Sequence, residues 1–385
     1  MDGMMRPEAF RAELAGNILP YWLRYAPDEA RGGFHGERDG QNAILPDSPR
    51  SSVLCSRILW TFASAYRLLG EKAYLDMARC AYTYLTGPMW DVEHGGVYAM
   101  VDPNGTPLTR EKRLFSQAFA IFALSEYHRT TGHTQALDTA KRLYGLIEEH
   151  ATDRAFGGYH ETLDRAWGVL HGSKSTDAHM HIIEAYTNLL VVWDNAELRS
   201  RLAYLVELVI EKAISKESGH MLLTFDGTWK RVSEEVAFGQ DIENSWLLCV
   251  AAERVGEPCL LEKARAAALG LVAAVAEVDD GKGMPYGWTP KHGVDTDRCW
   301  WVQSEAVLGY MNAFAITGQQ KYYEAANSVW HFIRTHMLDK TYGDWYCRVD
   351  AKNRPRMDKP KISAWKCPYH NARMCIVMSS NVCGA

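Results

Sequence analysis

A glycine-aromatic element that returns at an even interval is the feature that most constrains the fold of this chain. It begins at Gly32, Gly95, Gly157, Gly219, Gly281 and Gly343, so that successive glycines differ in residue number by 63, 62, 62, 62 and 62. Six such units account for nearly all of the 385 residues. An even period of this length predicts an array of similar structural units.

Apolar residues with helical spacing fill the stretches between these elements. The predicted helices span residues 7–25, 52–70, 72–87, 115–131, 134–150, 177–194, 197–214, 239–256, 259–278, 300–318, 320–338 and 367–379. A pair of helices cannot bury its apolar faces alone, so neighbouring pairs must stack. The chain shows no linker or low-complexity segment, and we expect a single domain over residues 1–385.

Six helical pairs can close into a ring of inner helices surrounded by outer helices. We therefore predict an all-α (α/α)6 barrel, in which the glycine-aromatic elements form short β-like hairpins between the pairs. An open helical solenoid is the alternative. We favour the closed barrel because solenoid repeats are usually shorter and lack such a hairpin.

Composition excludes several classes of protein. The 42 Lys and Arg against 47 Asp and Glu give a net charge of −5, and no basic block suggests a nucleic-acid partner. No apolar run reaches the roughly 18 residues of a membrane span, and the first residues do not resemble a signal peptide. The 9 scattered cysteines argue against a disulfide framework or a thiolate zinc site. We expect a cytoplasmic protein with no membrane partner, as a monomer or weak homodimer.

Polar side chains capable of chemistry recur near the start of the first helix in most units. Those at a similar offset from a glycine of the preceding element, between 23 and 27 in residue number, are Arg57, His181, Glu243, Glu305 and His370. Equivalent positions of a closed ring converge on one mouth of the barrel, where a concave site would form. Helical spacing places further residues on the same faces: Asp177, Glu184, Trp246, Trp301 and Arg373. The second unit offers only Gln117.

Two other patterns bear on the ligand. His179 and His181 are poor metal ligands together, because residues two apart on a helix point about 160° away from each other. The 13 tryptophans are many for this length, and Trp246, Trp301 and Trp365 lie close to the polar positions. Aromatic faces suit the C–H faces of sugar rings, although core packing is the alternative for each indole. The cluster favours a carbohydrate as the small-molecule partner.

Seven segments resemble, in the same order, those of one known family. They are LCSRILWTFASAYRLLG, EHGGVYAM, FSQAFAIFALSEY, HMHIIEAYTNL, FGQDIENSWLL, DTDRCWWVQSEA and WKCPYHNARMC. Between about residues 8 and 378 the chain resembles the N-acylglucosamine 2-epimerase superfamily, and within it the cellobiose 2-epimerase branch. The resemblance implies an (α/α)6 barrel that needs no metal and no other cofactor, and that acts on the reducing-end sugar of β-1,4-disaccharides such as cellobiose and mannobiose.

The resemblance also implies a chemistry. The sugar ring opens, a proton leaves C2 beside the aldehyde, and a cis-enediolate forms. Return of a proton to the opposite face interconverts the glucose and mannose configurations. Histidine suits proton transfer near neutral pH.

The resemblance assigns roles residue by residue. His370 is the acid or base on one face, His181 assists ring opening, and Arg57 steadies the enediolate oxygen. Glu243 and Glu305 bind hydroxyls and orient their neighbours. The remaining substrate-binding candidates are Trp246, Trp301, Trp365, Asp177, Asn371 and Arg373.

The chain departs from the family pattern at three places. Gln240 stands where the family has its second catalytic histidine, and an amide forms hydrogen bonds but cannot act as an acid or base at neutral pH. Asp177 stands where close relatives usually have asparagine. The last helix is short before the tail MCIVMSSNVCGA.

Two hypotheses follow for Gln240. In the first, glutamine replaces a histidine and silences the enzyme, so Gln240→His would raise epimerisation of cellobiose by several orders of magnitude. In the second, glutamine is natural, and His370 alone moves a proton from C2 to C1, which is aldose–ketose isomerisation and would yield ketose from mannose, glucose or cellobiose.

Other functions also stay open. N-acylglucosamine 2-epimerase activity is a rival within the family, although no glycine-rich phosphate loop is present for a nucleotide. A glycoside hydrolase would use two carboxylates, for which Glu243 and Glu305 are candidates. A non-catalytic sugar-binding protein is the remaining class.

Overall fold

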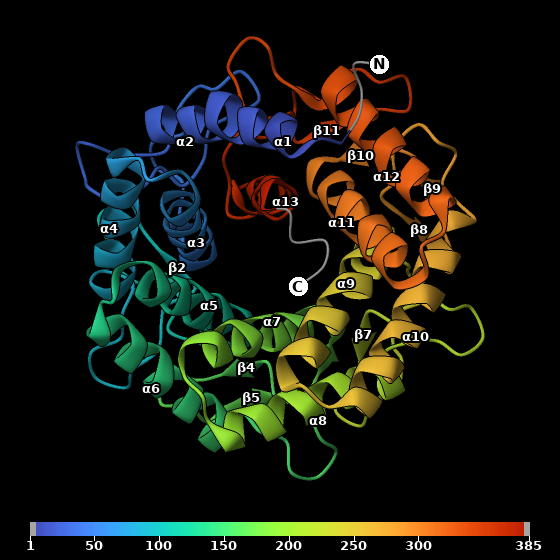
Figure 1. The fold of residues 1–385 in the computed structure, drawn as a ribbon. Coiled ribbons are helices and arrows are strands. Elements are labelled where there is room, and N and C mark those ends of the chain that lie inside the picture. Colours follow the sequence, from blue (N-terminus) through green and yellow to red (C-terminus); the bar gives the residue numbers. More distant parts are fainter. Residues whose placement is uncertain (1–4, 381–385) are drawn as a thin grey trace.

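The computed structural model describes residues 5–380 and arranges two concentric rings of helices (Figure 1). The inner helices are α3 (Ser52–Leu69), α5 (Leu114–Thr131), α7 (Thr176–Val192), α9 (Phe238–Val255), α11 (Trp300–Thr317) and α13 (Tyr369–Ser379). The outer helices are α4 (Lys72–Thr86), α6 (Thr134–His150), α8 (Ala196–Lys212), α10 (Pro258–Ala276) and α12 (Gln320–Phe332), which continues as the π-helical segment η2 (Ile333–Met337). The N-terminal outer helix comprises α1 (Pro7–Glu13), the π-helical η1 (Leu14–Ile18) and α2 (Leu19–Tyr25).

The ring closes through both ends of the chain. Each inner helix packs against the next, and α13 completes the circle by packing against α11 and α3. The N-terminal α1 covers α13 on the outside, so the sixth helical pair combines the first helix with the last. Phe10 of α1 also packs against Trp330 of α12, with 4.4 Å between the ring centroids. The predicted (α/α)6 barrel is confirmed, and the open solenoid is wrong.

The helix boundaries lie within two residues of those predicted, because local capping determines them. The Ser51 hydroxyl accepts from the backbone N–H of Val53 at 3.1 Å at the start of α3. Gly70 and Gly318 end α3 and α11 in the left-handed conformation, as expected of a C-terminal glycine. The last inner helix spans 11 residues, which agrees with the predicted short helix, and residues 381–385 of the tail lie outside the described residues.

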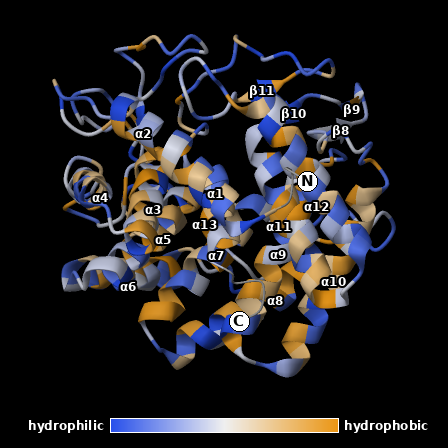
Figure 2. Ribbon diagram, turned by 45° about the horizontal axis from the view of Figure 1, so that its top comes forward, coloured by the Kyte–Doolittle hydropathy of each residue, from blue (hydrophilic) through white to orange (hydrophobic). Residues whose placement is uncertain are grey.

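Short antiparallel strands tie neighbouring units together. They pair as β1 (Arg50–Ser51) with β2 (Met100–Val101), β3 (Lys112–Arg113) with β4 (Thr162–Leu163), β6 (Lys174–Ser175) with β7 (Thr224–Phe225), and β10 (Arg298–Cys299) with β11 (Arg348–Val349). In addition, β5 (Val169–His171) joins β4, and β8 (Gly287–Thr289) pairs with β9 (Gly293–Asp295). Strands β1, β3, β6 and β10 each lead into an inner helix, so the strands gather where the inner helices begin. Figure 2 shows mostly hydrophilic loops with β8–β11 at this end, and hydrophobic residues concentrated along the helices.

A polar side chain on the outward face of four inner helices fastens each glycine-aromatic turn. It is always the fourth residue of the helix, and it accepts from a backbone N–H of the turn: Gln117 from Val97 at 2.8 Å, His179 from Tyr159 at 3.0 Å, Asp241 from Met221 at 2.6 Å and Gln303 from Met284 at 2.9 Å. These four side chains follow one another at the interval of the repeat. Gln117 and His179 are therefore structural, and His179 points away from His181 as predicted.

Ion pairs, most of them buried, reinforce the same turns. In five units a cation just before or beside an inner helix contacts an aspartate of the turn: Arg50–Asp28, Lys112–Asp91, Lys174–Asp153, Arg298–Asp280 and Lys361–Asp339. The fourth unit differs, because Ser215 and Val236 stand one repeat interval after Asp153 and Lys174.

Within residues 5–380, no helix combines the length and apolarity that a membrane span requires.

The fourth unit supplies a matched test of these ion pairs. Lys174 Nζ lies 2.6 Å from Asp153 Oδ2, and both side chains are buried. We expect Lys174→Val to lower the free energy of unfolding by about 3–5 kcal/mol, because it leaves a buried carboxylate unpaired. The double variant Asp153→Ser/Lys174→Val copies the fourth unit and should lose clearly less. Chemical denaturation measures both, and equal losses would contradict this account.

Candidate active site

Five equivalent side chains converge inside the ring, one from each of the inner helices α3 to α11. Each is the sixth residue of its helix and follows the previous one at the interval of the repeat: Arg57, Phe119, His181, Glu243 and Glu305. All five are buried. The second unit thus contributes Phe119 and not Gln117, and the regular interval in the sequence is the signal that could have found it.

The guanidinium of Arg373, on α13, forms the centre of a buried charge cluster. It donates to Glu243 at 2.6 Å and to Glu305 at 2.8 Å, and it also donates to Glu184. The ring of Trp246 lies 4.7 Å from the guanidinium carbon. This arginine therefore joins α13 to carboxylates of α7, α9 and α11, and one face of Trp246 is covered by it.

His370 lies beside this cluster with its Nδ1 2.7 Å from Glu305 Oε1. Because Arg373 donates to that same oxygen and Trp246 donates to the other at 3.0 Å, both oxygens act as acceptors. The Nδ1 of His370 therefore carries the hydrogen, and its Nε2 is free to accept a proton. Burial lowers the pKa of His370 well below its ordinary value, so this imidazole is neutral at pH 7.

His181 has the opposite electrostatic character. Its Nδ1 lies 3.0 Å from Glu184, and its Nε2 lies 3.5 Å from Asp177. Burial disfavours the charged ring, but the two carboxylates outweigh it and raise the pKa of His181 to about 9. Two histidines with pKa values moved apart are the pattern of an acid and a base in one site.

Arg57 is the second buried arginine of the site, and unlike Arg373 it has no carboxylate partner. Its Nη1 contacts only the sulfur of Cys367 at 3.6 Å, and its guanidinium carbon lies 4.4 Å from the ring of Phe119. Its Nε is buried without a hydrogen-bond partner, and no carboxylate among residues 5–380 pairs with it. An unpaired buried cation is suited to stabilise an oxyanion that develops during a reaction.

Asp177 and Gln240 meet at the starts of α7 and α9. The amide nitrogen of Gln240 donates to Asp177 at 3.3 Å, and the amide oxygen is buried without a partner. The Asp177 side chain is 43% exposed, in contrast to the buried glutamates. The two residues that depart from the family pattern, Asp177 and Gln240, are therefore hydrogen-bonded to each other.

The aromatic candidates differ in their surroundings. Trp365 is 59% exposed and lies 5.6 Å from the ring of Phe115, so its face is available to a ligand. Trp301 lies 5.6 Å from His370. Its indole packs on Gly239, where a Cβ would come within 2.3 Å of the ring, so glycine is required for this close approach.

The position of Asn371 differs from the prediction that this residue binds substrate. Its amide nitrogen donates to Asp344 at 2.7 Å, and the residue is fully buried. Asp344 also binds Lys366 at 2.6 Å. Asn371 therefore fastens the last glycine-aromatic turn, because it points to the outer side of α13, and it is not a substrate-binding residue.

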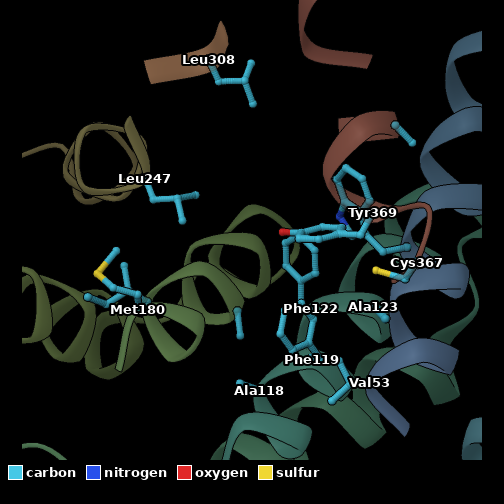
Figure 3. Close-up of a cluster of buried hydrophobic side chains, with 14 of the residues drawn as sticks. Val53, Ala118, Phe119, Phe122, Ala123, Met180, Leu247, Leu308, Cys367 and Tyr369 are labelled. Carbon is cyan, nitrogen blue, oxygen red and sulfur yellow. The ribbon is translucent and has the colours of Figure 1, made fainter. Parts of the chain in front are cut away.

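Apolar side chains fill the interior beside the charged cluster. Figure 3 shows Phe119, Phe122 and Tyr369 packed together, and the ring centroids of both phenylalanines lie 5.7 Å from Tyr369. The Tyr369 hydroxyl donates to Glu184. The sequence placed Tyr369 only among the aromatic residues near the polar positions, and Glu184 only on the His181 face of its helix. Glu184 stands one repeat interval before Trp246, and this equivalence to a site residue is the sequence signal that could have identified it.

One group of side chains has the composition of a metal site. Ligand atoms of Glu243, Glu305 and His370 lie within 4.8 Å of one another. The carboxylates already bind the Arg373 guanidinium, which brings a positive charge to the place a metal ion would occupy. The arrangement therefore disfavours a cation.

The fold and site define a class: (α/α)6 barrels that bring histidine, arginine and glutamate together at the start of the inner helices. A family model described as N-acylglucosamine 2-epimerase (GlcNAc 2-epimerase) matches residues 32–373. The chain belongs to this family.

Individual relatives agree with this assignment. The chain is 39% identical to the cellobiose 2-epimerase of Bacteroides fragilis, over 98% of this chain and 99% of that protein. The solved structure of cellobiose 2-epimerase from Bacillus thermoamylovorans is 33% identical, with a TM-score of 0.91 over 98% of this chain and 99% of that one. The D-mannose isomerase of Marinomonas mediterranea is 25% identical over 90% and 91% of the two chains.

The raised pKa of His181 predicts a pH-dependent stability. Because the folded pKa of about 9 exceeds the ordinary 6.5, the ion pairs of His181 stabilise the fold fully below pH 6.5, and this contribution is lost as pH rises through 9. We expect a loss of roughly 3 kcal/mol across this window. Denaturation at several pH values measures it. The variant His181→Gln should lack this slope, and an unchanged slope would contradict the assignment.

Proposed function

We propose that this chain interconverts the glucose and mannose configurations at C2 of the reducing-end residue of β-1,4-disaccharides such as cellobiose and mannobiose. The observation that carries the proposal is the neutral imidazole of His370 in the same buried site as the unpaired guanidinium of Arg57. Proton removal next to a carbonyl needs a base and a group that stabilises the developing oxyanion. The relatives named cellobiose 2-epimerase support the disaccharide as substrate.

The site residues take the following roles in this proposal. The protonated His181 donates toward the sugar oxygen during ring opening, and the Nε2 of His370 takes the C2 proton. Arg57 stabilises the enediolate oxygen. Trp365 stacks on the sugar, Trp301 holds His370 in place, and Glu243 and Glu305 orient Arg373 and His370.

Aldose–ketose isomerisation is the second candidate. The observation that favours it is Gln240, which cannot act as an acid or base at neutral pH and leaves His370 without its family partner. The relatedness to a D-mannose isomerase agrees with this chemistry. In that reaction His370 would return the proton to C1 on the same face and produce a ketose.

Incubation with cellobiose in deuterated water separates the candidates. We expect deuterium at C2 and the appearance of the mannose epimer by NMR, at the same rate in the presence of EDTA. His370→Gln should lower the rate by about 10²–10⁴-fold, because it removes the base. Asp138→Asn, an exposed change on the outer helix α6, is the control and should have no effect.

Other outcomes would contradict epimerisation. A ketose with label at C1 would assign the isomerase reaction. Free glucose would indicate a glycoside hydrolase, and sugar binding without turnover would indicate a binding protein. Epimerisation of N-acetylglucosamine in place of cellobiose would assign the activity that the family model is named for.

A further inference from the structure

Inversion of a carbon requires proton exchange on two faces. In the proposed reaction, His370 serves one face of C2 from α13. In the ring of six inner helices, α7 lies opposite α13, because α3 and α5 separate them on one side and α9 and α11 on the other (Figure 1). A group that serves the second face therefore comes from α7 or from its neighbours α5 and α9.

Most side chains in this half of the ring cannot exchange a proton. On α5, Phe115 and Phe119 carry no exchangeable proton. On α9, Gln240 is an amide. Burial raises the pKa of Glu243, but this carboxylate binds Arg373 and lies 3.8 Å from Nδ1 of His370, so it belongs to the His370 side of the site. On α7, Glu184 is also bound to Arg373, and despite its burial the surrounding cations lower its pKa to about 2.

Asp177 and His181 remain, and they contact each other. Asp177 lies in the first turn of α7 with an oxygen 3.5 Å from Nε2 of His181. Its hydrogen-bond donor is the neutral amide of Gln240, and no lysine or arginine among residues 5–380 pairs with it. Asp177 is thus an accessible carboxylate at the site that no arginine holds, next to an imidazole that can supply it with a proton.

We propose that Asp177 is the catalytic residue that exchanges a proton with the second face of C2, with His181 as its proton donor. This inference rests on the proposed epimerase function. It differs from the family's two-histidine scheme and from both hypotheses for Gln240, because the enzyme is neither silenced nor restricted to one face.

The step balances as follows. The Nε2 of His370 takes the proton from C2, and the C–H electron pair forms the C1–C2 double bond as the carbonyl pair moves to O1 beside Arg57. Nε2–H of His181 passes its proton to the Asp177 carboxylate, and Asp177 gives that proton to the opposite face of C2. The double-bond pair forms the new C–H bond while the carbonyl re-forms. Water restores the proton of His181 and takes the one gained by His370.

The departures from the family pattern suggest the deciding experiment. The pattern has asparagine at position 177 and histidine at position 240, whereas this chain has aspartate and glutamine. Compared with the pattern, the amide has moved from position 177 to position 240, and the group that can carry a proton has moved from position 240 to position 177. The double variant Asp177→Asn/Gln240→His moves the proton-carrying group back.

Four proteins are compared for epimerisation of cellobiose in deuterated water. Asp177→Asn should lower kcat by about 100-fold or more. The dissociation constant for cellobiose, measured by calorimetry, should stay within about threefold, because an amide keeps the hydrogen-bonding shape of the carboxylate. The double variant should recover at least about tenfold over Asp177→Asn, which a merely structural role of Asp177 would not produce. Gln240→His alone should not raise kcat by more than about tenfold, because Asp177 already serves the second face.

Three results would overturn the inference while the parent enzyme epimerises cellobiose. These are an Asp177→Asn variant with more than a third of the parent rate, a double variant no faster than Asp177→Asn, and a rise of several orders of magnitude in Gln240→His alone. A parent protein that turns over no cellobiose would instead contradict the proposed function itself. Asp138→Asn again serves as the aspartate-to-asparagine control on an outer helix.

Discussion

The ion pairs of Arg373 hold the site together. This buried guanidinium of α13 binds carboxylates from α7, α9 and α11. Removal of a partner in such a buried network leaves an uncompensated charge and costs several kcal/mol. The helix α13, near the C-terminal end, packs under α1, near the N-terminal end, and closes the ring. The charged site forms only when α13 is in this position, because α13 carries Arg373. The position of His370 depends on this closure, since its partner Glu305 is also a partner of Arg373.

One scaffold position serves different purposes in successive units. The sixth residue of an inner helix faces the interior and is in turn arginine, phenylalanine, histidine, glutamate and glutamate. The fourth residue faces outward and fastens a turn wherever it is polar. The two positions therefore have separate functions because they point to opposite sides of the helix. A change at the sixth residue alters the site, whereas the fourth residue stabilises the repeat. Asp177 and Gln240 lie one turn before the inner positions of α7 and α9 and on the same helix faces, so the exchange of an ionisable group and an amide between them also alters the site.

Much of this architecture could be predicted from the sequence. The even repeat of the glycine-aromatic element and the helical spacing of apolar residues are local signals, and they placed the helix boundaries within two residues. The same spacing placed Arg57, His181, Glu243 and Glu305 at one level of the barrel. The prediction for Asn371 was wrong, because motif proximity to His370 says nothing about which side of α13 the amide faces. Glu184 and Tyr369 received no role, because their importance comes from contacts with Arg373 across the ring.

The sequence by itself determined the number of units, the order of the helices and the residue types that reach the interior. These follow from covalent spacing, because helical phase and repeat length need no knowledge of distant contacts. The tertiary structure decided that α7 faces α13, that Arg373 gathers three glutamates, and that His370 is neutral while His181 is charged. Such properties depend on desolvation and on charges a few ångströms away in space, and residues far apart in the sequence supply both.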